Sequence, residues 1–146
     1  LKTCSIRIFS VYGPGLKKQL FWDIAQKVKN ASVVELFGTG QESRDFIFID
    51  DLVRAIDVVI THASMQAEVI NVASGQQTPI AQVAQLFLDV LQPSAILKFT
   101  GESRSGDPTR WQADITQLNT LGFQPKITIE DGLLQYTQWL NENELV

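Results

Sequence analysis

Arg44 is the residue whose type and position most clearly suggest chemistry. It follows the polar loop from Gly38 to Ser43 and precedes the apolar segment 46–49, so its head group is expected at a rim where a loop meets a rigid element. A guanidinium keeps its charge at any working pH and offers a planar fork of donors that matches two phosphate oxygens. The alternative is a surface arginine paired with Asp45 or Glu42, and the spacing alone leaves both interpretations open.

A second candidate lies in the polar segment from Arg104 to Pro108, which its composition predicts to be a loop. Arg104 and Asp107 stand three residues apart around Gly106. A cation and a carboxylate at this spacing can reach different ends of one ligand, the cation a phosphate and the carboxylate the hydroxyls of a ribose. The alternative is a salt bridge within the loop, which is usually worth about 0 to 1 kcal/mol when exposed. Trp111, close to this loop, is expected to face a ligand.

Other titratable residues predict neither a metal site nor a disulfide. The single Cys4 has no cysteine to pair with, and the single His62 adds too few ligands for zinc. Asp50 and Asp51 are explained by capping and by the dipole of a helix that starts there. A reducing, cytoplasmic location fits this cysteine usage best.

Composition excludes several partner classes. The chain has 146 residues, which suits one domain, and 45% of them are hydrophobic. Its formal net charge of -4 argues against a surface that follows nucleic-acid phosphates. No apolar run approaches the roughly 18 residues of a spanning helix, so no membrane partner is expected.

The elements that must position these residues alternate between strand and helix patterns, which is typical of α/β layering. Strands are predicted over 4–9, 33–37, 46–49, 69–72 and 96–99, and helices over about 20–28, 50–60, 79–91, 114–121 and 128–141. Thr78 is expected to cap a helix that has Pro79 as its first residue. Thr128 and Asp131 form a variant capping box for the last helix.

Four segments, taken in order, resemble the C-terminal half of the extended short-chain dehydrogenase/reductase family, the NAD-dependent epimerases and dehydratases of nucleotide sugars. They are residues 7–15, 38–51, 71–75 and 104–108. The resemblance implies a small substrate-binding α/β subdomain, together with strands that complete a Rossmann-like sheet. Residues 1–146 are then expected to be the C-terminal substrate-binding portion, with the NAD-binding half upstream. Strands 5–9 and 69–72 are expected to belong to that larger sheet and to leave unpaired edges.

The resemblance also implies roles for individual residues. Arg44 and Arg104 correspond to residues that contact the nucleotide diphosphate, and Asp107 corresponds to one that contacts the ribose. Ser10 stands at a substrate-contacting position where family members usually have Asn, and a serine has a shorter reach. The implied protein is an NAD-dependent epimerase or dehydratase of a UDP- or dTDP-sugar that forms a homo-oligomer.

Two family signatures are missing from this sequence, so no catalytic residue is assigned. The cofactor fingerprint is a glycine-rich turn between a strand and a helix, whereas Gly38 and Gly40 lack a third glycine and lead into a strand. The proton-transfer dyad is a Tyr followed four residues later by Lys, whereas Tyr12 and Tyr136 are each followed at that spacing by Leu. The alternative function is therefore a non-catalytic nucleotide-sugar-binding or assembly module of the same fold.

Overall fold

The computed structural model describes residues 1–102, 106 and 108–146, and it confirms the α/β class. Strands and helices alternate along most of the chain. Their bounds are β1 Thr3–Ile8, β2 Ser10–Tyr12, α1 Gln19–Val28, β3 Val33–Leu36, β4 Ser43–Phe48, α2 Ile49–His62, β5 Gln66–Val72, β6 Gln77–Pro79, α3 Ile80–Leu91, β7 Ile96–Phe99, α4 Thr116–Thr120 and α5 Ile129–Glu142. The short strands β2 and β6 were not predicted from the sequence.

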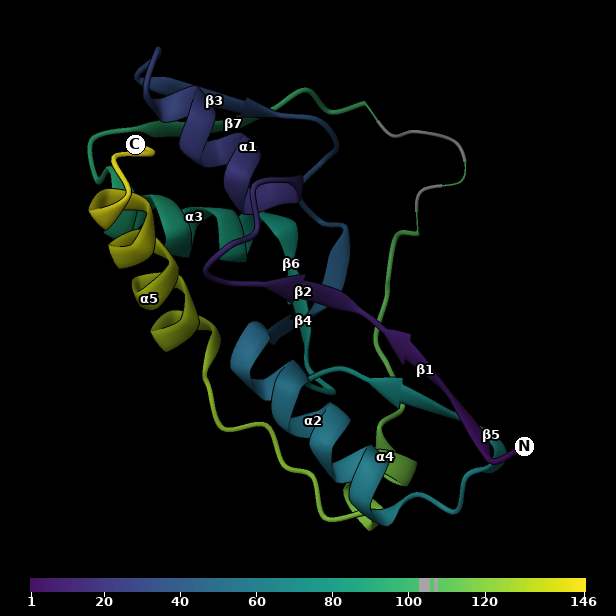
Figure 1. Ribbon diagram of the computed structural model, residues 1–146. Coiled ribbons are helices and arrows are strands. Elements are labelled where there is room, and N and C mark those ends of the chain that lie inside the picture. The colour runs from purple at the N-terminus through teal and green to yellow at the C-terminus, as the bar shows by residue number, and fades with distance from the viewer. Residues whose placement is uncertain (103–105, 107) are drawn as a thin grey trace.

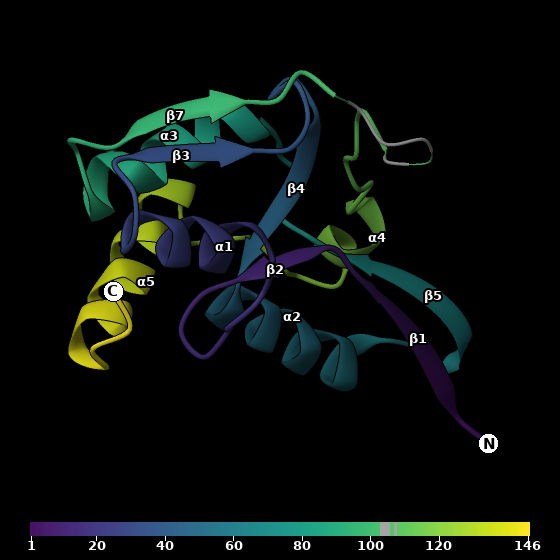
Figure 2. The ribbon, with the colours of Figure 1, turned by 90° about the horizontal axis from the view of Figure 1, so that it is seen from above.

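The strands form three small sheets: one in each of two lobes, and a third between the lobes. One lobe contains the parallel pair β3 and β7 with α1, α3 and α5, and the other contains the parallel pair β1 and β5 with α2 and α4 (Figure 1). The middle sheet has the order β2-β4-β6, with β2 parallel and β6 antiparallel to β4. Seen from above, β2 and β4 run between the two lobes (Figure 2). We call the two parts the α5 lobe and the α2 lobe.

Each lobe has its own hydrophobic core. The core of the α5 lobe is rich in aromatic rings, among them Phe21, Phe87 and Tyr136, whereas that of the α2 lobe is mainly aliphatic. Strand β4 contributes to both, because successive side chains of a strand point to opposite faces. Ile47 packs in the α2 lobe and its neighbour Phe48 in the α5 lobe.

The helices begin and end within about two residues of the predicted bounds, but the start of α3 is capped differently from the prediction. Thr78 lies in β6 and makes no cap hydrogen bond to the helix. The N–H groups of Ile80 and Ala81 instead donate to the carbonyls of Glu42 and Gly40, at 2.7 and 2.9 Å. A distant loop therefore caps α3 through its backbone. None of the described helices is long and apolar enough to cross a bilayer.

The cap of α5 by Thr128 is confirmed. The Thr128 hydroxyl accepts a hydrogen bond from the N–H of Asp131 at 3.1 Å. The prediction for α2 is wrong, because this helix begins at Ile49 and neither Asp50 nor Asp51 is its N-cap.

Asp51 instead joins α2 to the connection that precedes α5. Its side chain is only 1% exposed and forms an ion pair with Arg54. The second carboxylate oxygen accepts the N–H groups of Lys126 and Ile127, at 2.9 and 3.0 Å. Asp51 thus holds residues far apart in the sequence together, which a local capping argument does not predict.

The β1 and β5 pair is the least covered part of the fold. Ile70 and Val72 of β5 are buried in the core of the α2 lobe, while Ile8 of β1 and Val69 of β5 are 50% and 41% exposed. Parallel strands are usually buried on both faces, and each strand of a two-stranded sheet has an unpaired edge. These edges agree with the expectation that both strands extend a larger sheet, which stays a prediction.

Candidate functional site

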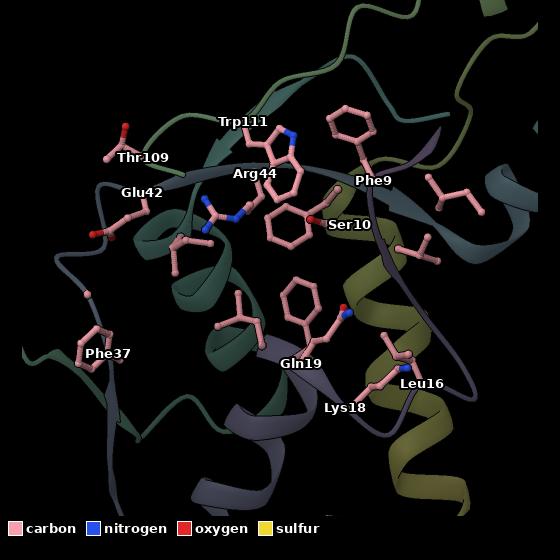
Figure 3. Close-up of a pocket in the computed structure, with 17 residues that line it drawn as sticks. Phe9, Ser10, Leu16, Lys18, Gln19, Phe37, Glu42, Arg44, Thr109 and Trp111 are labelled. Carbon is pink, nitrogen blue, oxygen red and sulfur yellow. The ribbon is translucent and has the colours of Figure 1, made fainter. Parts of the chain in front are cut away.

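A cavity of about 660 Å³ opens beside β4, where the start of α1, the end of β3 and the segment 109–111 meet (Figure 3). This size lies within the range of small-ligand sites, roughly 300 to 1,000 Å³. Aromatic and aliphatic side chains form much of its wall, and a few polar groups converge on it. The loop from Phe37 to Glu42 and strand β2 complete the lining.

Arg44 supplies the central cation of this cavity. Its Nη1 donates to the carbonyls of Ser43 and Pro108, at 2.8 and 2.6 Å. The guanidinium also lies 5.7 Å from the centroid of the Trp111 ring, a cation–π contact. Within the described part of the chain these bonds use one nitrogen of a fork that has five N–H groups, so donors are left for an oxyanion.

Arg44 forms no ion pair with either of the described carboxylates Asp45 and Glu42, the alternative that its spacing had left open. Both carboxylates accept hydrogen bonds from other groups, Asp45 from backbone N–H groups that include that of Ala113, and Glu42 from the loop that contains Gly40.

The fold brings Ser10 to the same cavity, because β2 lies beside β4 with Ser10 opposite Phe46. In Figure 3, Ser10 and Arg44 are both drawn below Trp111 at this cavity. Arg104 and Asp107 lie outside the described residues. The chain is described again from Pro108, whose carbonyl accepts the bond from Arg44.

Trp111 lines the cavity, as expected for a residue that faces a ligand, and is 46% exposed. Its ring meets Phe9 edge to face at a centroid distance of 5.7 Å. Lys18 and Gln19, at the start of α1, also line the cavity, and no local pattern in the sequence indicates this. Gln19 has a φ of 67°, which is uncommon for a residue with a side chain and is found at strained functional positions.

The loop containing Gly38 and Gly40 does not fit the pyrophosphate of a dinucleotide. The Glu42 carboxylate already accepts the N–H groups of Thr39 and Gly40, at 3.1 and 2.9 Å, and the Thr39 hydroxyl at 3.0 Å. Desolvation raises the pKa of Glu42, but these hydrogen bonds outweigh it and leave the pKa below its usual value. The loop therefore binds an anion from within the chain, and it leads into β4 rather than into a helix.

Both tyrosine hydroxyls are also engaged. The Tyr12 hydroxyl donates to the Ile129 carbonyl at 3.4 Å, and burial together with the carboxylates of Asp51, Glu130 and Asp131 raises its pKa. The Tyr136 hydroxyl donates to the Leu16 carbonyl at 2.6 Å, and burial raises its pKa to about 12. Both hydroxyls are therefore held in the protein interior, and neither tyrosine lines the cavity.

Comparison with known proteins gives a consistent picture. Residues 1–73 match the family described as NAD dependent epimerase/dehydratase. An uncharacterized UDP-glucose epimerase, YtcB of Bacillus subtilis, is 28% identical over 93% of this chain and 43% of its own length. Probable GDP-L-fucose synthase 1 of Oryza sativa is 31% identical over 80% of this chain and 35% of its own length.

Solved structures share the fold over nearly the whole chain. The Y149F mutant of UDP-glucuronic acid 4-epimerase from Bacillus cereus, in complex with a fluorinated UDP-glucuronic acid and NAD, superposes with a TM-score of 0.85. Its sequence is 27% identical, and the match covers 98% of this chain and 46% of that one. This chain thus spans less than half the length of the relatives that it matches here.

Proposed function

Because the chain belongs to the NAD-dependent epimerase/dehydratase family, we propose that it forms the substrate-binding portion of such an enzyme, with residues 1–146 as one unit. The ligand would be a nucleotide sugar, bound through its diphosphate. The observation that carries this proposal is the position of Arg44, whose guanidinium lines a cavity of about 660 Å³ together with Ser10 and Lys18. The family uses NAD, and we propose that the residues that hold it lie largely outside this chain.

The site supports a division of roles. Arg44 would contact the diphosphate, since guanidinium to phosphate is a charge-assisted and often bidentate contact. Lys18 would add a second positive charge at the mouth of the cavity. Ser10 would meet a hydroxyl or phosphate oxygen of the ligand, and Trp111 would cover it. Arg104 and Asp107 are proposed for the diphosphate and ribose on the resemblance alone.

Relatives supply the candidate ligands. UDP-sugars are named for the Bacillus proteins and a GDP-sugar for the rice protein. We propose a UDP-sugar, because the UDP-sugar enzymes match the chain over more of its length. Homo-oligomerisation is part of the proposal; for this chain alone, pairing between copies would cover the open edges of β1 and β5.

Calorimetric titration of UDP, UDP-glucose and GDP into the protein tests this proposal. Arg44→Ala is expected to weaken UDP binding by about 1.5 to 3 kcal/mol, the scale of a hydrogen bond to a charged group. Arg44→Lys should restore only part of the loss, because an ammonium lacks the planar fork. Arg54→Ala removes an equal charge on α2, outside the cavity, and should leave the affinity unchanged.

Equal UDP affinity in wild type and Arg44→Ala would refute the assignment of the diphosphate site. A parallel titration with NAD should show no tight binding by this chain. Micromolar NAD affinity would contradict the conclusion that its described residues do not fit a dinucleotide.

A further inference from the structure

Three consecutive residues of β4 hold the segment that returns to the cavity after Pro108. The N–H of Ser43 donates to the Thr109 carbonyl at 3.0 Å, and Nη1 of Arg44 donates to the Pro108 carbonyl at 2.6 Å. The carboxylate of the third residue, Asp45, accepts the N–H of Ala113 at 3.1 Å. We call residues 108–113 the return segment.

Asp45 is the fully buried member of this group, with no exposed surface. Besides Ala113 it accepts the N–H and the hydroxyl of Ser74, at 2.9 and 2.7 Å, and the N–H of Gly75 at 3.0 Å. The turn that contains Gly75 is itself tied to the return segment, since the Gln112 side chain donates to the Gly75 carbonyl at 2.8 Å. Four donors from two segments thus converge on one carboxylate.

The chemistry of this position suits a carboxylate and no other side chain of the same size, because all the groups that converge on it are donors, although burial raises the pKa of Asp45. A carboxylate only accepts hydrogen bonds, and its two oxygens offer about four acceptor sites. An asparagine would place an NH₂ group against N–H donors. The return segment would then lose a fixed point two residues from Trp111, the residue whose ring covers Arg44.

We propose that Asp45 is a positioning residue, which fixes the return segment against β4 so that Trp111 and the Pro108 carbonyl orient the Arg44 guanidinium toward the cavity. Asp45 itself is buried and does not line the cavity. Its contribution to ligand affinity rests on the proposed function of Arg44, whereas its contribution to the placement of Trp111 does not. The two contributions are therefore measured separately.

The first measurement follows Trp111 without ligand. In a Trp22→Phe/Trp139→Phe background the remaining indole is Trp111, and its quenching by acrylamide reports its exposure. Asp45→Asn is expected to increase this quenching at a temperature where the variant is folded. Ser74→Ala removes one of the four donors and should give a smaller increase.

Asp51→Asn is the matched control. Asp51 is likewise buried and accepts two backbone N–H groups, against three for Asp45, but it lies outside the cavity. Both variants should lower the melting temperature, and only Asp45→Asn should change the Trp111 signal. Equal quenching in Asp45→Asn and in the parent would overturn the proposal, as would an equal increase in Asp51→Asn.

The second measurement is a double-mutant cycle with UDP as the probe. Asp45→Asn should weaken UDP binding about tenfold in the presence of Arg44, which corresponds to about 1.4 kcal/mol. In the Arg44→Ala background the same change should alter the affinity less than about twofold, because its effect passes through Arg44. An undiminished effect in that background would show that Asp45 does not act through Arg44.

The two arms separate the possible failures. If Arg44→Ala alone leaves UDP affinity unchanged, the proposed diphosphate site is wrong, and the Trp111 quenching still decides whether Asp45 positions the return segment.

Discussion

Removal of the Asp51 carboxylate should destabilise the protein strongly, although this residue stands in the first turn of a surface helix. Asp51→Ala leaves the N–H groups of Lys126 and Ile127 without their acceptor, and each such loss costs about 1 to 3 kcal/mol when the group is buried. Both N–H groups are partly buried, so the lower part of this range applies. The Arg54 side chain is 36% exposed, and its lost ion pair adds only about 0 to 1 kcal/mol.

The expected total is about 3 kcal/mol, which for a domain of this size lowers the melting temperature by roughly 6 to 12 °C. Circular dichroism during thermal unfolding measures it. Asp50→Ala, in the same turn but exposed, is the matched control and should change stability by no more than about 0.5 kcal/mol. Equal shifts in the two variants would mean that Asp51 acts only through the helix terminus, as the sequence alone suggested, and would refute the tertiary role.

Three further changes test the packing, the loop and the open sheet. Gly132→Ala should lower the free energy of unfolding in urea by about 1 to 3 kcal/mol despite the better helix propensity of Ala, because the new Cβ would collide with the Tyr12 hydroxyl; no loss would disprove this contact. The pKa of Glu42 is lowered in the fold, so the ionised carboxylate stabilises the folded protein. This stabilisation is fully present above the ordinary Glu pKa of about 4.3 and is lost as the pH falls through the lowered value. Thermal unfolding of Glu42→Gln should therefore depend less on pH in this acid range than that of wild type or of the exposed-site control Glu102→Gln, and parallel curves would contradict the loop geometry. If the edges of β1 and β5 self-associate, the melting temperature should rise over a roughly hundredfold range of protein concentration, whereas a constant value with monomeric light scattering would show that these strands need no partner.

Patterns confined to one element predicted most of the fold. Local patterns predicted α1, α3 and α5 to within a residue or so, and the Thr128 cap of α5 was found because its partner Asp131 lies within one helical turn. Trp139 packs against the core of the α5 lobe and stacks on Tyr136 at a centroid distance of 5.7 Å.

Features made by distant residues were missed. The start of α3 was assigned to Thr78, because no local pattern shows that the carbonyls of Gly40 and Glu42 arrive there. Strands β2 and β6 are three residues long and exist only because β4 lies between them. Asp45 was missed for the same reason. The sequence suggested a surface ion pair with Arg44, whereas the structure shows a buried carboxylate that accepts hydrogen bonds from distant segments.

The two cores that meet at β4 also determine where the length of this chain can change. A residue inserted into β4 would move Ile47 to the face of the aromatic core and Phe48 to that of the aliphatic one, since each step along a strand reverses the side chain. Both lobes would be disrupted by a single insertion, so neither could compensate for the other. We therefore expect sequences of this fold to align without gaps through β4, and insertions and deletions to be confined to surface connections.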